Sequence, residues 1–212
     1  MDFDTIFQHA GEMVRQKLAA SGGCHDFDHT MRVLHNAEAI LAHTPEADRQ
    51  ITLLAALLHD IARPEEDAAK GKCCHAELGA IEAAALLEKL AAPPELSHAV
   101  AAAIATHRFR RGGAPQSIEA KILFDADKLD SLGAVGIGRA FIFAGKNDAR
   151  VHNTREEALN NPPYSREDTA YREFLVKLQK IPTRLFTPYA KKIALSRVAF
   201  MENFFDTLDQ EM

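Results

Sequence analysis

Apolar residues recur at spacings of three and four positions along almost the whole chain, which is the period of helices that bury one face. Runs that alternate β-branched and polar residues, as in a half-buried strand, are nearly absent. The sequence therefore predicts an all-α fold. The expected helices span residues 4–20, 27–42, 47–62, 75–90, 94–106, 118–132, 135–144, 166–179 and 187–208.

The helix expected over residues 47–62 differs from the others because Leu53–Leu58 is apolar almost all round. A helix without a polar face is buried on all sides, so this one should be central. Its expected end is Arg63-Pro64, since proline disfavours the helical conformation at the residue before it. The polar stretch 146–165, which contains Asn160-Asn161-Pro162-Pro163, is the candidate mobile loop or lid.

Length and composition are those of an ordinary globular protein. The chain has 212 residues and a mass of 23.4 kDa, with 47% hydrophobic and 26% charged residues. These values favour one compact domain and exclude a disordered chain, a fibrous repeat or a disulfide-stapled miniprotein. The net charge of −5 gives no general attraction to nucleic acid or to an anionic membrane, so we expect no extended nucleic-acid surface.

Three further features indicate a soluble cytoplasmic protein. No apolar run approaches the roughly 18–20 residues that a membrane-spanning helix requires. The start, MDFDTIFQHA, carries acids where a signal peptide has a basic region and an apolar core. The three cysteines, two of them adjacent at Cys73 and Cys74, make no disulfide framework.

His59-Asp60, directly after Leu53–Leu58, is the first candidate for chemistry. A carboxylate at the edge of so apolar a segment costs free energy unless it is paired or binds a metal. Taken alone, the pair fits a helix-capping carboxylate beside a hydrogen-bonded core histidine better than it fits a metal site. The pair is not isolated, however, and this changes the interpretation.

Further imidazoles and carboxylates stand at the ends or inner faces of the expected helices. They are His25-Asp26-Phe27-Asp28-His29, His75, His107 and Asp125-Ala126-Asp127-Lys128-Leu129-Asp130. Imidazole and carboxylate are the ligands expected for Mn, Fe, Co, Ni or Zn, with Mg favoured only where carboxylates and water dominate. The pattern predicts a divalent metal site that does not need the cysteines.

The order His29, His59-Asp60 and Asp127 resembles the HD superfamily of metal-dependent phosphohydrolases, which is named for its adjacent His-Asp pair. Similarity to its small single-domain bacterial members extends over Asp125–Asp130, Gly133–Arg139 and the tail from Lys177 to Glu211. The resemblance implies a single HD domain over residues 1–212. Its metal-site core would cover about 22–145, and a C-terminal helical pair, about 165–212, would pack on that bundle.

By position, the resemblance assigns the principal metal to His29, His59, Asp60 and Asp127. HD proteins differ in whether two further histidines hold a second metal, so His75 and His107 stay open between second-metal ligands, substrate contacts and structural roles. As structural residues, His75 would cap its helix or support the ligands, and His107 would interact with a helix dipole. His25 and Asp26 are expected beside the ligands, where metal-bound histidines find hydrogen-bond partners.

Three basic side chains are candidate substrate-binding groups: Arg32, one turn after His29, Lys128, directly after Asp127, and Arg139. A guanidinium or an ammonium suits phosphate oxygens. Salt bridges to neighbouring acids are the alternative role, and for Arg139 the two roles are equally good. The general acid stays unassigned, because Arg63 stands where some HD nucleotidases carry an acid. Glu65 and Glu66 are candidate proton donors, although a solvated charge run is commoner.

These observations favour a metal-dependent phosphohydrolase that cleaves a phosphate ester or anhydride of a small substrate, with nucleotides as the favoured class. A bound divalent metal would lower the pKa of its water to about 7. Asp60 would hold that metal, and Arg32 and Lys128 would stabilise charge on the phosphoryl oxygens. The alternatives are a non-catalytic metal- and nucleotide-binding module, and a di-iron HD-type oxygenase that uses His75 and His107.

The sequence also leaves the oligomeric state open. Apolar residues of the last helix, Phe200, Phe204, Phe205 and Leu208, could serve a homodimer, although packing onto the chain's own bundle is the commoner role. Metal identity, substrate identity and the general acid are equally open.

Overall fold

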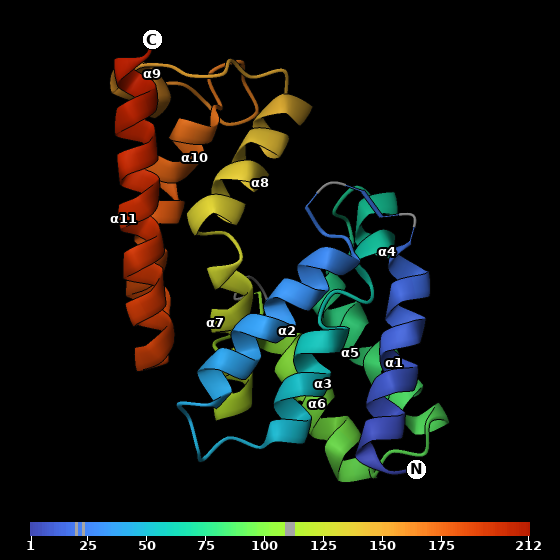
Figure 1. The fold of residues 1–212 in the computed structure, drawn as a ribbon. Helices are drawn as coiled ribbons and strands as arrows, with labels where there is room; N and C mark the ends of the chain where they lie inside the picture. Colours follow the sequence, from blue (N-terminus) through green and yellow to red (C-terminus); the bar gives the residue numbers. More distant parts are fainter. Residues whose placement is uncertain (20, 23, 109–112) are drawn as a thin grey trace. The chain divides into compact units, whose positions relative to one another are not determined.

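The structure is a computed structural model that describes residues 1–19, 21–22, 24–108 and 113–212, and over these residues it contains helices, turns and bends but no strand (Figure 1). This confirms the all-α prediction. The helices are α1 (Phe3–Leu18), α2 (Phe27–Leu41), α3 (Arg49–Leu58), α4 (Arg63–Ala68), α5 (His75–Lys89), α6 (Pro94–Thr106), α7 (Ile118–Leu129), α8 (Gly133–Lys146), α9 (Arg155–Asn160), α10 (Ala170–Val176), the 3₁₀ helix η1 (Leu178–Arg184) and α11 (Pro188–Gln210).

The chain divides into two compact units, Met1–Asp127 and Lys128–Met212, and the division falls inside α7. In the first unit α3 is central, as its apolar sequence predicts, because it packs against α1, α2 and α6. Every residue from Thr52 to Leu58 is buried. Helices α5 and α6 pack on each other, and α4 packs on α5.

Side-chain caps determine where the helices near the His-Asp pair begin. Asp26 precedes α2, and its carboxylate accepts a hydrogen bond of 2.9 Å from the backbone N–H of His29. Asp48 caps α3 in the same way through the N–H groups of Gln50 and Ile51. Such caps satisfy N–H groups that have no partner within the helix. The local sequence therefore specifies where α2 and α3 begin, and with the start of α2 it places His29 in the first turn of that helix.

Helix α3 ends at Leu58 with His59 as its C-cap, earlier than the predicted end at Arg63-Pro64. Tight turns follow, in which Ile61 N–H donates to Leu58 O and Arg63 N–H donates to Asp60 O. Pro64 lies in the first turn of α4, a helix that was not predicted. Proline fits there because its missing N–H would have no partner in a first turn anyway. The prediction treated Pro64 as a helix stop, whereas it belongs to the start of the next helix.

In the second unit, α8 packs against α10 and α11, and η1 packs against α10 and α11. An aromatic cluster fills this unit, with the ring of Phe205 stacked on Phe174 and tilted against Tyr171. Arg197 from α11 donates a hydrogen bond of 2.6 Å to the carbonyl of Leu129 at the end of α7. Phe205 is therefore buried inside its own unit, while Phe200 is 51% exposed.

The polar stretch 146–165, predicted as a loop, contains the short helix α9. Thr154 and Glu157 form a reciprocal capping box at its start, a signal present in the sequence but not used in the prediction. The buried Asn153 side chain donates to the Glu167 carbonyl and accepts from the Thr169 hydroxyl. The loop prediction is therefore wrong for residues 155–160, because a local cap and a buried amide organise the segment.

The helix predicted over residues 94–106 is confirmed as α6 with the same bounds, and the other remaining predicted helices have counterparts with shifted ends. The helix expected over residues 166–179 is the shorter α10, which η1 follows, and the helix expected over 118–132 ends at Leu129. The first helix ends at Leu18, while its predicted end, Ala20, lies outside the described residues. Over the described part of the chain, no helix has the length and apolarity needed to cross a membrane.

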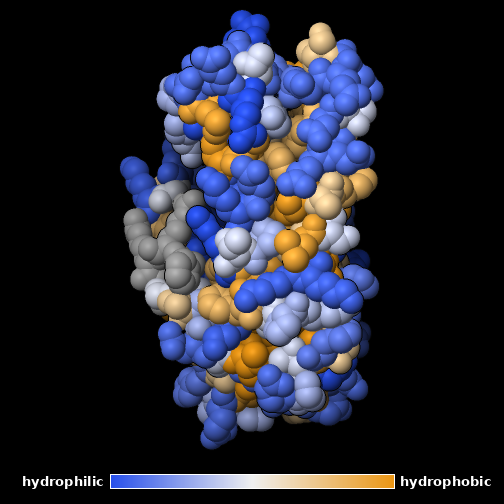
Figure 2. Space-filling model, turned by 90° about the vertical axis from the view of Figure 1, so that its left-hand side faces the viewer, coloured by the Kyte–Doolittle hydropathy of each residue, from blue (hydrophilic) through white to orange (hydrophobic). Residues whose placement is uncertain are grey.

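Hydrophobic residues on the face drawn in Figure 2 are interspersed with hydrophilic ones.

Candidate metal centre

Several separate helix ends of the first unit supply the side chains of the candidate site. His25 and His29 come from the start of α2, His59-Asp60 from the turn after α3, and His75 from the first residue of α5. His107 is the C-cap of α6, and Asp127 lies in the last turn of α7. The site therefore consists of residues placed where helices begin and end.

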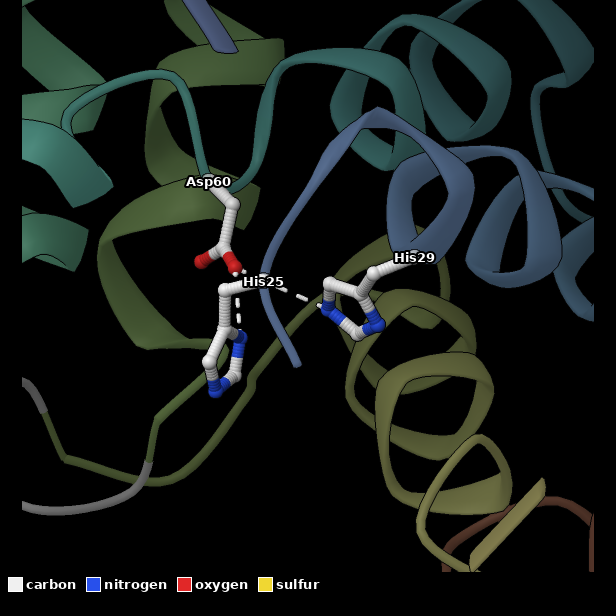
Figure 3. Close-up of side chains that lie close together, drawn as sticks. All are labelled: His25, His29 and Asp60. Carbon is white, nitrogen blue, oxygen red and sulfur yellow. Dashed lines mark hydrogen bonds and ion pairs between the residues drawn. The ribbon is translucent and has the colours of Figure 1, made fainter. Parts of the chain in front are cut away.

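The Asp60 carboxylate lies at the centre of this site and is 3% exposed. One oxygen, Oδ2, lies 3.1 Å from His25 Nδ1 and 3.6 Å from His29 Nε2 (Figure 3). The same oxygen is 3.8 Å from His59 Nε2. The other oxygen, Oδ1, lies 3.0 Å from His75 Nε2 and 4.0 Å from His107 Nε2. Asp60 thus faces histidines on both sides.

Among the described residues, three overlapping sets of donor atoms are close enough to hold a metal ion. They are His29, His59 and Asp127; Asp60, His75 and His107; and His25, His29 and Asp60, and within each set the atoms lie within 4.8 Å of one another. The Nε2 atoms of His29 and His59 are 3.3 Å apart, and those of His75 and His107 are 3.2 Å apart. Ligands bound at about 2.0–2.2 Å to one ion have comparable separations, so the residues fit a divalent metal.

In His59 and His107, the hydrogen bond made by Nδ1 determines that Nε2 is the nitrogen available to a metal. His59 Nδ1 lies 2.8 Å from the Ala56 carbonyl, and His107 Nδ1 lies 2.7 Å from the Ile104 carbonyl. A carbonyl oxygen only accepts hydrogen bonds, so each Nδ1 carries the proton and each Nε2 keeps its lone pair. That is the tautomer of a metal-binding histidine whose other nitrogen is hydrogen-bonded to the protein.

Burial keeps the imidazoles of His59 and His107 neutral, because it lowers their pKa values. Burial, reinforced by the neighbouring His59, lowers the pKa of His107 to about 3, and burial also lowers the pKa of His59. Burial alone would raise the pKa of Asp60, but His59, His25 and His75 outweigh it and hold that pKa well below its usual value. The neutral imidazoles of His59 and His107 and the ionised carboxylate of Asp60 are in the protonation states that a metal requires of its ligands.

Glu66 also belongs to the site, although the sequence favoured a solvated charge run. It is buried, and its Oε2 lies 2.6 Å from His75 Nδ1. Arg63 and Arg108 donate to the two oxygens of this carboxylate. Glu65, its neighbour in sequence, forms an ion pair with Lys17 instead. The spacing of Arg63 and Glu66, one helical turn, is a local signal for this pairing, but nothing local indicates the contact with His75.

His25 and Asp26, which the sequence places beside the candidate ligands, have different roles. Asp26 caps α2, where its carboxylate accepts from the backbone N–H of His29. His25 lies directly against Asp60 and is less buried than the histidines behind it. Both residues therefore support the site through contacts within the first unit.

The predicted substrate-binding cations lie on three helices. Arg32 is half-buried on α2, one turn after His29, and Lys128 is half-buried and directly follows Asp127 in α7. Arg139 on α8 forms an ion pair with the buried Asp130 within the second unit. For Arg139 the structure therefore contains the ion pair that was the alternative to substrate binding.

Comparison with known proteins gives consistent similarities. A family model described as HD domain matches residues 26–132. The uncharacterized protein YpgQ of Bacillus subtilis is 32% identical over 204 residues, which cover 94% of this chain and 90% of that protein.

Solved structures are similar to this chain over nearly its full length. The crystal structure of B. subtilis YpgQ in complex with ADP has a TM-score of 0.75 at 27% identity, covering 100% of this chain and 97% of that one. An HD-superfamily hydrolase from Bacillus thuringiensis has a TM-score of 0.76 at 28% identity, covering 99% and 98%. A predicted HD superfamily hydrolase from an uncultured Thermotogales bacterium has a TM-score of 0.69 at 30% identity, covering 96% and 91%.

Proposed function

This chain belongs to the HD-domain family, and from that membership we propose that it is a metal-dependent phosphohydrolase that cleaves a phosphate ester or anhydride of a nucleotide. The observation that carries the proposal is the convergence of buried histidines on the two oxygens of Asp60. Burying such groups without a compensating partner is costly, and a divalent cation supplies that partner. The nucleotide class is supported by YpgQ, which was crystallised with ADP.

His29, His59, Asp60 and Asp127 would hold the principal cation. Asp60 Oδ1, His75 and His107 would form a second cation position beside it. Three imidazole-rich sets favour Mn, Fe, Co, Ni or Zn over Mg, which prefers carboxylates and water. A bound divalent cation supplies an activated water and neutralises charge on a phosphoryl group.

The chain's own residues then bind and orient the substrate around that position. Arg32 follows His29 by one turn of α2, and Lys128 follows Asp127 in α7. We assign both side chains to phosphoryl oxygens, where a guanidinium offers paired N–H donors and an ammonium offers a compact positive charge. The Ala56 and Ile104 carbonyls keep the Nδ1 protons of His59 and His107 in place, so neither imidazole has to change tautomer before binding a metal.

The test is release of orthophosphate and pyrophosphate across a nucleotide panel, with metal-stripped protein reloaded with Mn, Mg, Co, Ni, Zn or Fe. We expect release that depends on the metal, and the product identifies the bond that is cut. The same panel run on Asp60→Ala protein is the control and should be silent. Nucleotide binding without release under every metal would contradict the proposal and favour a binding module.

One observation favours a second candidate function, a di-iron oxygenase. Asp60 Oδ2 lies near His29 and His59 while Oδ1 lies near His75 and His107, an arrangement that suits two neighbouring iron ions. Iron in the protein as purified, with oxygen uptake and a silent phosphate panel, would favour this function. Release of phosphate by Mn- or Zn-loaded protein would contradict it.

A further inference from the structure

The Nδ1 atom of His75 contacts groups of opposite hydrogen-bonding character, a carboxylate and two guanidiniums. It lies 2.6 Å from Glu66 Oε2, 3.0 Å from Arg63 Nη1 and 3.2 Å from Arg108 Nη1. The Nε2 atom of His75 lies 3.0 Å from Asp60 Oδ1 and 3.2 Å from His107 Nε2. The neighbour of Nδ1 therefore decides what Nε2 can offer to Asp60 and His107.

A carboxylate oxygen only accepts a hydrogen bond, whereas a guanidinium only donates. When Glu66 is the partner, Nδ1 carries the proton, and Nε2 keeps the lone pair that a cation placed between Asp60, His75 and His107 would bind. When a guanidinium is the partner, Nδ1 must accept, and the proton of a neutral imidazole moves to Nε2. The second arrangement removes the lone pair that a cation needs. The shortest of the three contacts is the one to Glu66.

We propose that Glu66 is a positioning residue that fixes the tautomer and orientation of His75, so that binding of a cation at Asp60, His75 and His107 depends on it. The inference deepens the proposed function and rests on its second cation position. Glu66 does not touch that position itself. It acts through His75.

The two arginines hold Glu66 from separate elements. Arg63 begins α4 and donates to Oε2 at 3.0 Å, and Arg108, just after α6, donates to Oε1. Both guanidiniums stay beside His75 if the carboxylate is removed, where they favour the wrong tautomer and add positive charge near a cation. Loss of Glu66 is therefore more damaging than loss of one hydrogen bond.

The other histidines of the site do not share this dependence. The Nδ1 atoms of His59 and His107 face backbone carbonyls, which a substitution at Glu66 leaves in place. The principal position, formed by His29, His59, Asp60 and Asp127, should therefore keep its cation when Glu66 is replaced. This selectivity separates a positioning role from general loss of structure.

The experiment measures Mn²⁺ and Zn²⁺ stoichiometry and affinity by titration calorimetry on full-length protein. Wild type should bind two ions per chain. Glu66→Ala should keep the tighter ion and bind the weaker one 10–100-fold less well, the usual effect of losing an outer partner of a ligating histidine. The matched control is Glu65→Ala, which removes the adjacent carboxylate, whose partner is Lys17, and should bind both ions as wild type does.

A second readout observes the tautomer directly. In ¹⁵N-histidine-labelled Zn-loaded protein, proton–nitrogen correlations should show His75 with its proton on Nδ1, and His75→Gln identifies the signal. In Glu66→Ala the proton should move to Nε2. Replacing Arg63 and Arg108 by alanine in that background removes the competing donors and should recover part of the weaker affinity. Glu66→Gln, which keeps the side-chain volume and an accepting oxygen, should be intermediate and carries the test if Glu66→Ala does not fold.

A wild-type chain that binds one ion, or a Glu66→Ala chain that binds two ions with unchanged affinity and tautomer, would overturn the inference. Neither readout uses phosphate release. A silent nucleotide panel with two bound ions would therefore refute the phosphohydrolase and leave the role of Glu66 intact.

Discussion

Asp60 is the residue that connects the other donor groups of the candidate site. Its two oxygens face different histidines, so one side chain joins the His29/His59 side to the His75/His107 side. A neutral substitute could not satisfy both sides, because the donor atoms would lose the negative charge that balances a cation. This dual contact distinguishes Asp60 from Asp127, which belongs to one donor set among the described residues.

The first prediction separates metal binding from substrate binding. Asp60→Ala should lose both the cation and phosphate release, because it removes the ligand common to both positions. Lys128→Ala should keep the cation and lower turnover, because the ammonium is assigned to phosphate. Metal content and phosphate release of the two purified proteins check this. Turnover by metal-free Asp60→Ala protein would refute the mechanism.

Among the elements, α3 joins the core to the candidate site. Its residues from Thr52 to Leu58 are buried because it packs against α1, α2 and α6, and the turn after it carries His59 and Asp60. The same packing that forms the core therefore positions these two candidate metal ligands.

Leu54 on α3 is 0% exposed, whereas Ile81 on α5 is 68% exposed. Leu54→Ala should lower the free energy of unfolding by about 2–5 kcal/mol, because it removes buried methyl groups and leaves a cavity. Ile81→Ala, the matched control, should change it by less than about 0.5 kcal/mol. Denaturant unfolding of the metal-free proteins measures both. Equal effects at the two positions would contradict the central place of α3.

Helix α9 allows a prediction about pH. The backbone and side chain of Thr154 donate to Glu157, and Arg150 lies beside it, so the pKa of Glu157 falls below its ordinary 4.5. A lowered folded-state pKa stabilises the fold above about pH 4.5, and this contribution is lost as the pH falls through the folded-state value. The stability difference between wild type and Glu157→Gln should therefore be present at pH 7 and shrink below pH 4.5. Unfolding measured across that range checks it, and a difference that grows on acidification would contradict the capping box.

At the scale of the whole molecule, the chain divides between Asp127 and Lys128. Every residue in the three candidate donor sets lies in the first unit, which ends at the ligand Asp127. Metal binding should therefore stabilise the first unit directly, because ligands from α2, α5, α6, α7 and the turn after α3 are joined by one centre.

Addition of Mn²⁺ or Zn²⁺ to metal-free protein should accordingly raise the Tm. A ligand that binds only the folded state at 100 times its Kd contributes about 2.7 kcal/mol. Thermal unfolding with and without metal measures the shift, and Asp60→Ala should show none. An unchanged Tm in wild type would count against a metal centre built from these residues.

The pattern of residues predicted the helical fold, the central place of Leu53–Leu58 and the family, and all three are confirmed. The assignment of His29, His59, Asp60 and Asp127 as principal metal ligands stays a prediction. Helical period and side-chain caps act over a few residues, so they can be recognised along the chain. Local rules also misled where Pro64 and the Thr154–Glu157 box begin helices that the prediction did not include.

Only the tertiary structure decided how these elements meet. Asp60 and His75 are separated by 14 residues along the chain, and no local pattern indicates that their side chains lie 3.0 Å apart or that Glu66 sits behind His75. Such contacts arise when helix ends converge as the core packs, because the burial of α3 brings the ends of its neighbours together. The identities of the side chains specify which donor atoms are available. The packing of the helices specifies which of these donor atoms lie close enough together to form one site.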